Sequence, residues 1–155
     1  MAIKINKILC PTDFSEPSDH SLQYGLELAR QYNAKLYLMH VIEPLTPVQG
    51  LDMGPSFGFD ERPHVEKRVE ELLHETVSDE MREAVEILPI IARGAPFLEI
   101  IRAARTEDVD MIVIATHGRT GLTHALLGST TEKVVRKAPC PVLSIRHPEH
   151  EFVHP

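Results

Sequence analysis

The 155-residue sequence predicts an α/β fold: an open, five-stranded parallel sheet in the order 3-2-1-4-5, with helices on both faces. Short apolar segments alternate with segments of helical periodicity, a pattern typical of right-handed βαβ crossovers. Within the short segments, apolar residues follow one another without alternating polar residues, as expected of strands covered on both faces. The strand order is an interpretation. It brings the two most distinctive loops, after the first and fourth strands, together at the switch point of the sheet, where ligands bind in such folds.

The first half of the chain begins with the apolar run Ile8-Leu9-Cys10, which predicts a buried strand. Apolar and small residues then recur at helical spacing and predict a helix from about 17 to 33. A second apolar run predicts a strand over 36–42. The next segment, 44–63, is rich in glycine and proline and has no clear periodicity. Loops of that length are usually functional or disordered.

The second half continues the alternation of helix and strand. The expected elements are a helix marked by apolar residues from Val65 to Val77, a strand over 87–92, a helix over 95–105, a strand over 111–115, a helix over 129–137 and a strand over 142–145. We therefore expect one domain over residues 1–147 and a short tail over 148–155.

Composition and charge narrow the class of protein. The formal net charge is −7 and no basic block is present, which disfavours nucleic acid as a partner because Lys and Arg must replace counterions on phosphate. No apolar run reaches the roughly 18 residues of a membrane helix, and no signal peptide is evident at the start. Cys10 and Cys140 lie outside any C-x-x-C pair, so we expect two reduced, buried thiols. These features together favour the cytoplasm.

A glycine-bearing loop leads from the fourth strand, which ends at Ala115, to the helix that begins at Ser129. Glycines let backbone N–H groups approach an anion closely, and a helix N-terminus adds free donors and a partial positive charge. Arg119 is the only fixed positive charge of the loop, and Ser129 to Thr131 add hydroxyl groups. The loop is therefore either a phosphate cradle or, since Ser129-x-x-Glu132 fits a capping box, an ordinary helix start.

Asp13, just after the first strand, also has two interpretations. Its carboxylate could accept hydrogen bonds from ribose hydroxyls or from an exocyclic amine. Asp13-x-x-Glu16 also fits a capping box ahead of Pro17.

Several familiar signatures are absent from the sequence. No lysine precedes Ser129, so the P-loop pattern fails, and no G-x-G-x-x-G or G-x-S-x-G is present. No Ser/His/Asp order stands out as a catalytic triad. His147, His150 and His154 could hold a metal, but no rigid element sets their spacing, which favours a solvated tail.

The segments Ala115-Thr-His-Gly118-Arg-Thr-Gly121, Leu126-Leu-Gly128-Ser129 and Ala138-Pro-Cys-Pro-Val142 resemble the C-terminal signature of universal stress proteins, and Ile8-Leu-Cys-Pro-Thr-Asp13 resembles the first strand of that family. ATP-binding members carry G-x2-G-x9-G-[ST]. Gly118, Gly128 and Ser129 match this motif, whereas Ala115 stands in place of its first glycine.

The resemblance implies a Rossmann-like fold, of the adenine nucleotide alpha hydrolase-like kind, that binds ATP, ADP or AMP, with or without Mg²⁺. Asp13 and the backbone near Val41 would line the ribose and base, and the glycine-bearing loop would hold the phosphates. The implied site residues are Pro11, Thr12, Asp13, Val41, Ala115, Gly118, Arg119, Gly128, Ser129, Thr130 and Thr131.

The resemblance further implies a regulatory or stress-survival module that is at most a weak ATPase. The alternative, for which Ala115 is the main support, is a nucleotide-independent stress protein that acts through contacts with an unknown protein. A ligase or nucleotidyl-transferase is disfavoured because the loop after the first strand lacks an S-G-G-x-D-S-like sequence. The resemblance and the exposed edge expected for the last strand both indicate a homodimer through Val142, Leu143, Ser144 and Ile145.

Overall fold

The computed structural model describes residues 2–44, 62–119 and 127–147. Most of the loop expected over 44–63 and the whole tail over 148–155 lie outside the described residues. The helices and strands, in chain order, are β1 (Lys7–Pro11), α1 (Glu16–Tyr32), β2 (Lys35–Ile42), α2 (Arg62–Glu75), α3 (Asp79–Ala84), β3 (Ile87–Arg93), α4 (Pro96–Thr106), β4 (Met111–Ala115), α5 (Ser129–Lys137) and β5 (Val142–Ile145).

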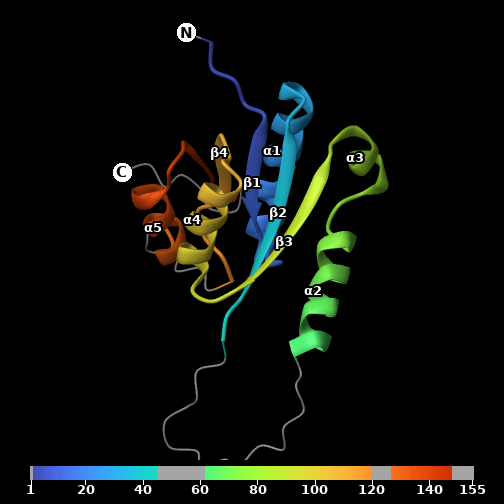
Figure 1. Ribbon diagram of the computed structural model, residues 1–155, viewed down its shortest axis with the longest axis vertical. Coiled ribbons are helices and arrows are strands. Elements are labelled where there is room, and N and C mark those ends of the chain that lie inside the picture. Colours follow the sequence, from blue (N-terminus) through green and yellow to red (C-terminus); the bar gives the residue numbers. More distant parts are fainter. Residues whose placement is uncertain (1, 45–61, 120–126, 148–155) are drawn as a thin grey trace, which may run out of the picture.

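The strands form one parallel sheet in the order β3-β2-β1-β4-β5, which confirms the predicted fold class (Figure 1). β1 lies in the middle, with Leu9 paired to Tyr37 of β2 on one side and to Ile112 of β4 on the other. Pro89 lies in β3 and lacks a backbone donor, which an edge strand tolerates.

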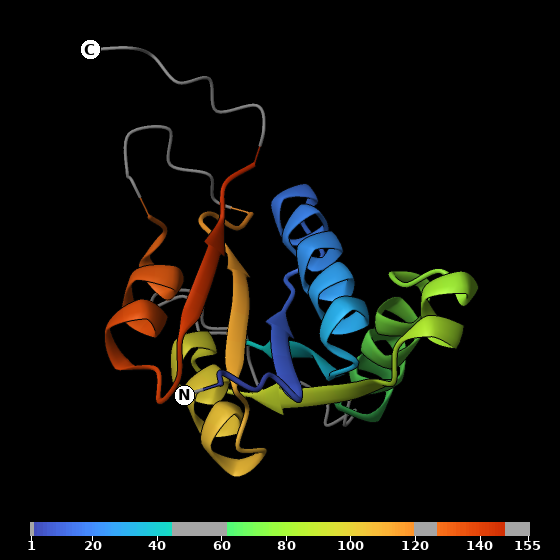
Figure 2. The same cartoon turned by 90° about the horizontal axis from the view of Figure 1, so that it is seen from above.

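Helices cover both faces of the sheet, and each face has its own apolar core (Figure 2). On one face, α1 and α2 bury residues such as Leu22 and Leu73 against Ile8 of β1. On the other, α4 and α5 bury Ile100 and Val134. Successive strand residues point to opposite faces and both faces are buried, which is why the strands read as continuous apolar runs.

α1 packs closely on β1 because a glycine, Gly25, faces the strand. A Cβ atom at Gly25 would collide with the Sγ atom of Cys10, which is fully buried. Burial raises the pKa of the Cys10 thiol far above its usual range. Cys140 is only partly buried, so the expectation of two buried thiols is wrong for it. It lies between α5 and β5, where it packs against the edge of the apolar core and stays partly exposed.

The structure differs from the predicted elements between α2 and β3. One helix was expected up to Val77, but α2 ends at Glu75 and a second helix, α3, begins after Ser78, whose side chain accepts a hydrogen bond from the N–H of Met81. α3 has six residues and none of them is buried, so it leaves no apolar periodicity in the sequence. None of the described helices is both long enough and apolar enough to cross a membrane.

Candidate functional site

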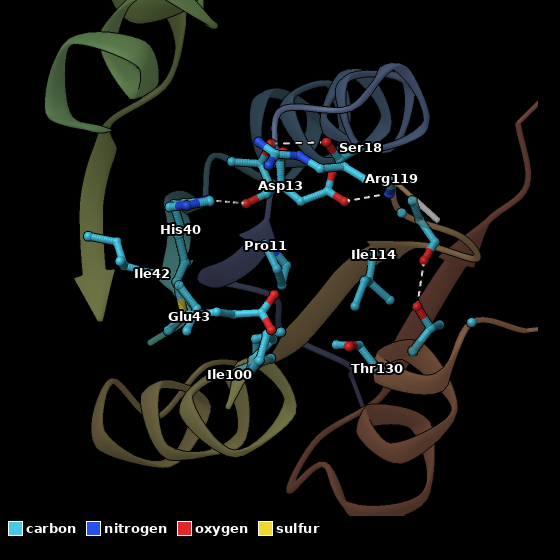
Figure 3. Close-up of a pocket in the computed structure, with 18 of the residues that line it drawn as sticks. Pro11, Asp13, Ser18, His40, Ile42, Glu43, Ile100, Ile114, Arg119 and Thr130 are labelled. Carbon is cyan, nitrogen blue, oxygen red and sulfur yellow. Dashed lines mark hydrogen bonds between the residues drawn. The ribbon is translucent and has the colours of Figure 1, made fainter. Parts of the chain in front are cut away.

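A cavity of about 490 Å³ opens at the carboxyl ends of β1, β2 and β4, at the switch point of the sheet (Figure 3). β1 and β4 are neighbours whose chains leave in opposite directions around the sheet, so the loops after them diverge and leave a crevice. The predicted site residues all line this cavity: Pro11, Thr12, Asp13, Val41, Ala115, Gly118, Arg119, Gly128, Ser129, Thr130 and Thr131.

Asp13 joins the loop after β1 to the glycine-bearing loop after β4. Its Oδ2 atom accepts a hydrogen bond from the backbone N–H of Arg119 at 2.9 Å. In return, the Arg119 side chain donates from Nε to the backbone oxygen of Asp13 at 2.8 Å (Figure 3). The two residues are 106 positions apart in the sequence, so this pair of bonds sets the position of one loop relative to the other.

The other carboxylate oxygen of Asp13 is bound to its own loop. Oδ1 accepts hydrogen bonds from the backbone N–H of Ser15 at 3.0 Å and from the Ser15 hydroxyl. Burial by itself would raise the pKa of Asp13, but these hydrogen bonds and the one from Arg119 outweigh it and hold the pKa below its usual value. Asp13 is therefore a carboxylate at neutral pH, turned toward backbone donors on both loops.

The capping interpretation of Asp13 is wrong. The N-cap of α1 is Ser15, whose side chain accepts a hydrogen bond from the N–H of Ser18. The helix thus begins two residues later than Asp13-x-x-Glu16 would place it, and Asp13 is left to bridge the loops.

Gly118 is required by the same contact. A Cβ atom at this position would collide with Oδ2 of Asp13, so a larger residue would push the two loops apart. The glycine therefore lets the carboxylate reach the backbone of the next residue, Arg119.

The N-terminus of α5 faces the cavity, and its N-cap is Gly128. The N-cap glycine has no side chain that could cap the helix, and Ser129 is the first helical residue, so the capping-box interpretation of Ser129 is wrong; Ser129 lines the cavity instead. The first turn of a helix leaves free N–H donors and a partial positive charge, which suit an anion. This end of the cavity is therefore rich in donors.

Thr131 has a structural role that the sequence did not predict. It is buried, and its hydroxyl donates to the backbone oxygen of Ala115 at 2.7 Å. This bond ties the first turn of α5 to the end of β4. The N–H of Gly128 donates to the backbone oxygen of Thr116 at 2.7 Å and reinforces the link.

The cavity also contains residues that the sequence analysis did not single out. Nδ1 of His40 donates to the backbone oxygen of Thr12 at 2.8 Å, and its ring packs against Phe14 with the ring centroids 4.5 Å apart. Glu43 follows β2 at the cavity wall. The remaining lining residues come from β2, α1, α2, α4, β4 and the loop after it: Ser18, Met39, Ile42, Val65, Val69, Pro96, Ile100, Ile114 and His117.

No sequence signal distinguished these side chains. Val69 and Ile100 are buried positions on amphipathic helices, and such positions read as ordinary core. His40 and Glu43 lie at the end of β2, where the only available clue was that carboxyl ends of parallel strands share one edge of the sheet.

The described residues contain no cluster of three or more His, Cys, Asp or Glu that could hold a metal ion. His147 lies near Glu16, with Nε2 and Oε1 3.6 Å apart. The other two histidines considered as metal ligands, at 150 and 154, lie outside the described residues.

Comparison with known proteins decides the family. The model of the universal stress protein family matches residues 4–146. The chain belongs to this family. Universal stress protein MJ0531 of Methanocaldococcus jannaschii is 31% identical over 157 residues, an alignment that covers 94% of this chain and 84% of that protein. Universal stress protein MJ0577 of the same organism is 32% identical, with 94% and 98% covered.

Solved structures of universal stress proteins share the fold. The structure of MJ0577 superposes with a TM-score of 0.78 at 29% identity and covers 94% of this chain and 98% of that one. A universal stress protein from Archaeoglobus fulgidus, solved in complex with dAMP, has a TM-score of 0.60 at 22% identity, with 93% and 99% covered. At that identity the likeness concerns the fold.

Proposed function

We propose that this universal stress protein binds an adenine nucleotide, as ATP, ADP or AMP, in the cavity and acts as a regulatory module in stress survival. The observation that carries the proposal is the make-up of the cavity: backbone donors and hydroxyls gather at one end, and apolar side chains line the other. A nucleotide has the same division, with phosphates at one end and an apolar-faced base at the other. The dAMP complex of the Archaeoglobus protein supports an adenine nucleotide in this fold.

The phosphates would lie at the N-terminus of α5, against the backbone of Gly128 and the hydroxyls of Ser129 and Thr130. The backbone at Gly118 would add a further donor. Ala115 lines the cavity where the family motif has a glycine, and its methyl group would narrow the path of the phosphates. Mg²⁺, where present, would enter with the phosphates of ATP.

The ribose and base would lie between β1 and β2. Pro11 and Thr12 form the wall on the β1 side, and Asp13 offers its remaining lone pairs to the ribose hydroxyls. The backbone of Val41 would meet the edge of the base.

Binding, rather than fast turnover, fits the charges around the cavity. Rapid phosphoryl transfer needs a positive charge on the transferred group and a residue that positions the attacking water. Arg119 instead donates from Nε to the backbone of Asp13, and both oxygens of Asp13 accept protein hydrogen bonds. We therefore propose slow hydrolysis at most.

We also propose that two copies pair through β5, in the cytoplasm. Supporting this, β5 is an edge strand of the sheet and the side chain of Leu143 is 37% exposed. Two-fold pairing of identical edges would cover both strands and close the assembly.

Isothermal titration calorimetry with ATP, ADP and AMP tests the nucleotide proposal. Ser129→Ala and Ser78→Ala form a matched pair, because both serines are exposed but only Ser129 lines the cavity. We expect the wild type to bind ATP, Ser129→Ala to bind it more weakly, and Ser78→Ala to bind it as the wild type does. No binding at millimolar ATP would instead favour the nucleotide-independent function.

A further inference from the structure

Glu43 places a carboxylate at the apolar end of the cavity. It is the first residue after β2, and Figure 3 shows its side chain pointing into the cavity, toward the region between Pro11 and Ile100. Glu43 itself is exposed. Its neighbours on the cavity wall are His40 and a set of apolar residues: Met39, Val41, Ile42, Val65, Val69 and Pro96.

The carboxylate of Glu43 has no hydrogen-bond or ion-pair partner among residues 2–44, 62–119 and 127–147. The other acidic residue of the cavity, Asp13, accepts hydrogen bonds at both of its oxygens. Glu43 is therefore the acidic side chain of the cavity that none of the described residues engages, whereas Asp13 has only its remaining lone pairs to offer. In apolar pockets, a few polar groups of this kind fix the orientation of a ligand and determine specificity.

The position of Glu43 relative to the hydrogen-bond donors at the N-terminus of α5 determines how a bound nucleotide is oriented in the cavity. In Figure 3, Glu43 lies on one side of the cavity, whereas Arg119 and Thr130 lie on the other, near the N-terminus of α5. A negative charge repels phosphate, so the phosphates would lie at the donor end and the base beside Glu43. This step rests on the proposed nucleotide function.

We propose that Glu43 is a specificity-determining residue whose carboxylate accepts a hydrogen bond from the 6-amino group of adenine, and so selects 6-aminopurine over 6-oxopurine nucleotides. An ionised carboxylate only accepts hydrogen bonds. Adenine carries an amino donor at C6, whereas guanine and hypoxanthine carry an oxygen acceptor there. With a 6-oxopurine, two acceptors would face each other and neither would have a donor.

The test compares the affinities for ATP and ITP, which differ at C6, in the wild type and in Glu43→Ala. We expect the wild type to prefer ATP by about tenfold or more, the size of one lost hydrogen bond to a charged group. In Glu43→Ala, the ATP affinity should fall by about tenfold and the preference should shrink to about twofold. Glu83→Ala is the matched control, since Glu83 is exposed on α3 and does not line the cavity.

Glu43→Gln separates base recognition from a loss of charge or of folding. The glutamine amide has both a donor and an acceptor, so it can rotate to serve either purine. We expect it to bind ITP more tightly than the wild type does, a gain that a damaged fold would not produce. Circular dichroism melting curves show whether each variant is folded.

Three results would overturn the inference, and they separate it from the proposed function. An ATP preference in Glu43→Ala equal to that of the wild type overturns the role of Glu43 alone. So does tighter binding of ITP or GTP than of ATP by the wild type. Absence of any nucleotide binding by the wild type overturns the proposed function and, with it, this inference.

Discussion

Replacing Asp13 with alanine removes the acceptor that joins the two loops of the cavity. Three donors lose their partner: the N–H of Ser15, the hydroxyl of Ser15 and the N–H of Arg119. Arg119 is exposed and Ser15 is only partly buried, so water can replace part of what is lost. The bond from Nε of Arg119 to the backbone oxygen of residue 13 can survive the substitution.

The expected loss in the free energy of unfolding is about 2 kcal/mol, the size of one hydrogen bond to a charged group, because water compensates for the others. The affinity for ATP should fall about tenfold, or about 1.4 kcal/mol, because the glycine-bearing loop loses its fixed position relative to β1. The chain contains no tryptophan, so urea unfolding is followed by circular dichroism and the affinity by calorimetry.

Asp110→Ala is the control that separates stability from binding. The Asp110 carboxylate accepts hydrogen bonds from the N–H groups of Asn6 at 2.7 Å and Lys7 at 3.0 Å, at the opposite end of the sheet from the cavity. It should lose stability without losing ATP affinity. If Asp13→Ala binds ATP within about twofold of the wild type, or if Asp110→Ala weakens binding equally, the bridging role of Asp13 is refuted.

The same carboxylate predicts a dependence on pH. Although burial opposes them, hydrogen bonds from Ser15 and Arg119 hold the pKa of Asp13 below its usual value in the folded protein. The stabilisation that the ionised Asp13 adds to the folded protein is therefore fully present above its unfolded pKa of about 4. It is lost as the pH falls through the pKa of Asp13 in the folded protein. The stability difference between wild type and Asp13→Ala should be constant from about pH 7 to 5 and shrink below about pH 4. A stability difference between the two proteins that grows as the pH is lowered would contradict the lowered pKa of Asp13.

Three further predictions concern the glycine motif and the sheet edge. Gly128→Val places a Cβ atom 3.2 Å from the backbone oxygen of Thr116 and adds bulk at the phosphate end, so a folded variant should lose at least about tenfold in ATP affinity; wild-type affinity in calorimetry would refute the cradle. Ala115→Gly should bind ATP more tightly while losing about 1 kcal/mol of stability in urea unfolding, because glycine weakens a strand; unchanged affinity would show that the methyl group does not narrow the phosphate path. Leu143→Pro should convert a dimer to monomers in sedimentation equilibrium; a wild type that stays at 17.4 kDa, or a dimeric variant, would rule out pairing through β5.

Much of the fold could be predicted because the spacing of apolar residues within short segments indicates which segments are strands and which are helices. The continuous apolar run at Ile8 to Cys10 identifies a strand buried on both faces, and the spacing of Leu22, Leu26 and Ala29 identifies the face of a helix. The switch-point argument then placed the loops that hold Asp13 and Gly118 side by side, and the structure brings them within hydrogen-bond distance. α3 escaped prediction because a short helix with no buried residue has no pattern to detect.

The sequence by itself determined the order of the strands, the family and the loop residues that line the cavity after β1 and β4. Only the tertiary structure decided what each polar group does. A capping box at Asp13 or Ser129 and a ligand-facing role have the same sequence pattern, and only the positions of the chain atoms show that Ser15 and Gly128 are the N-caps. Glu43 acquires its significance in the same way. It is an ordinary acidic residue along the chain and it is exposed, but it lines the same cavity as residues of α2, α4 and β4, because parallel strands bring distant segments to one edge of the sheet.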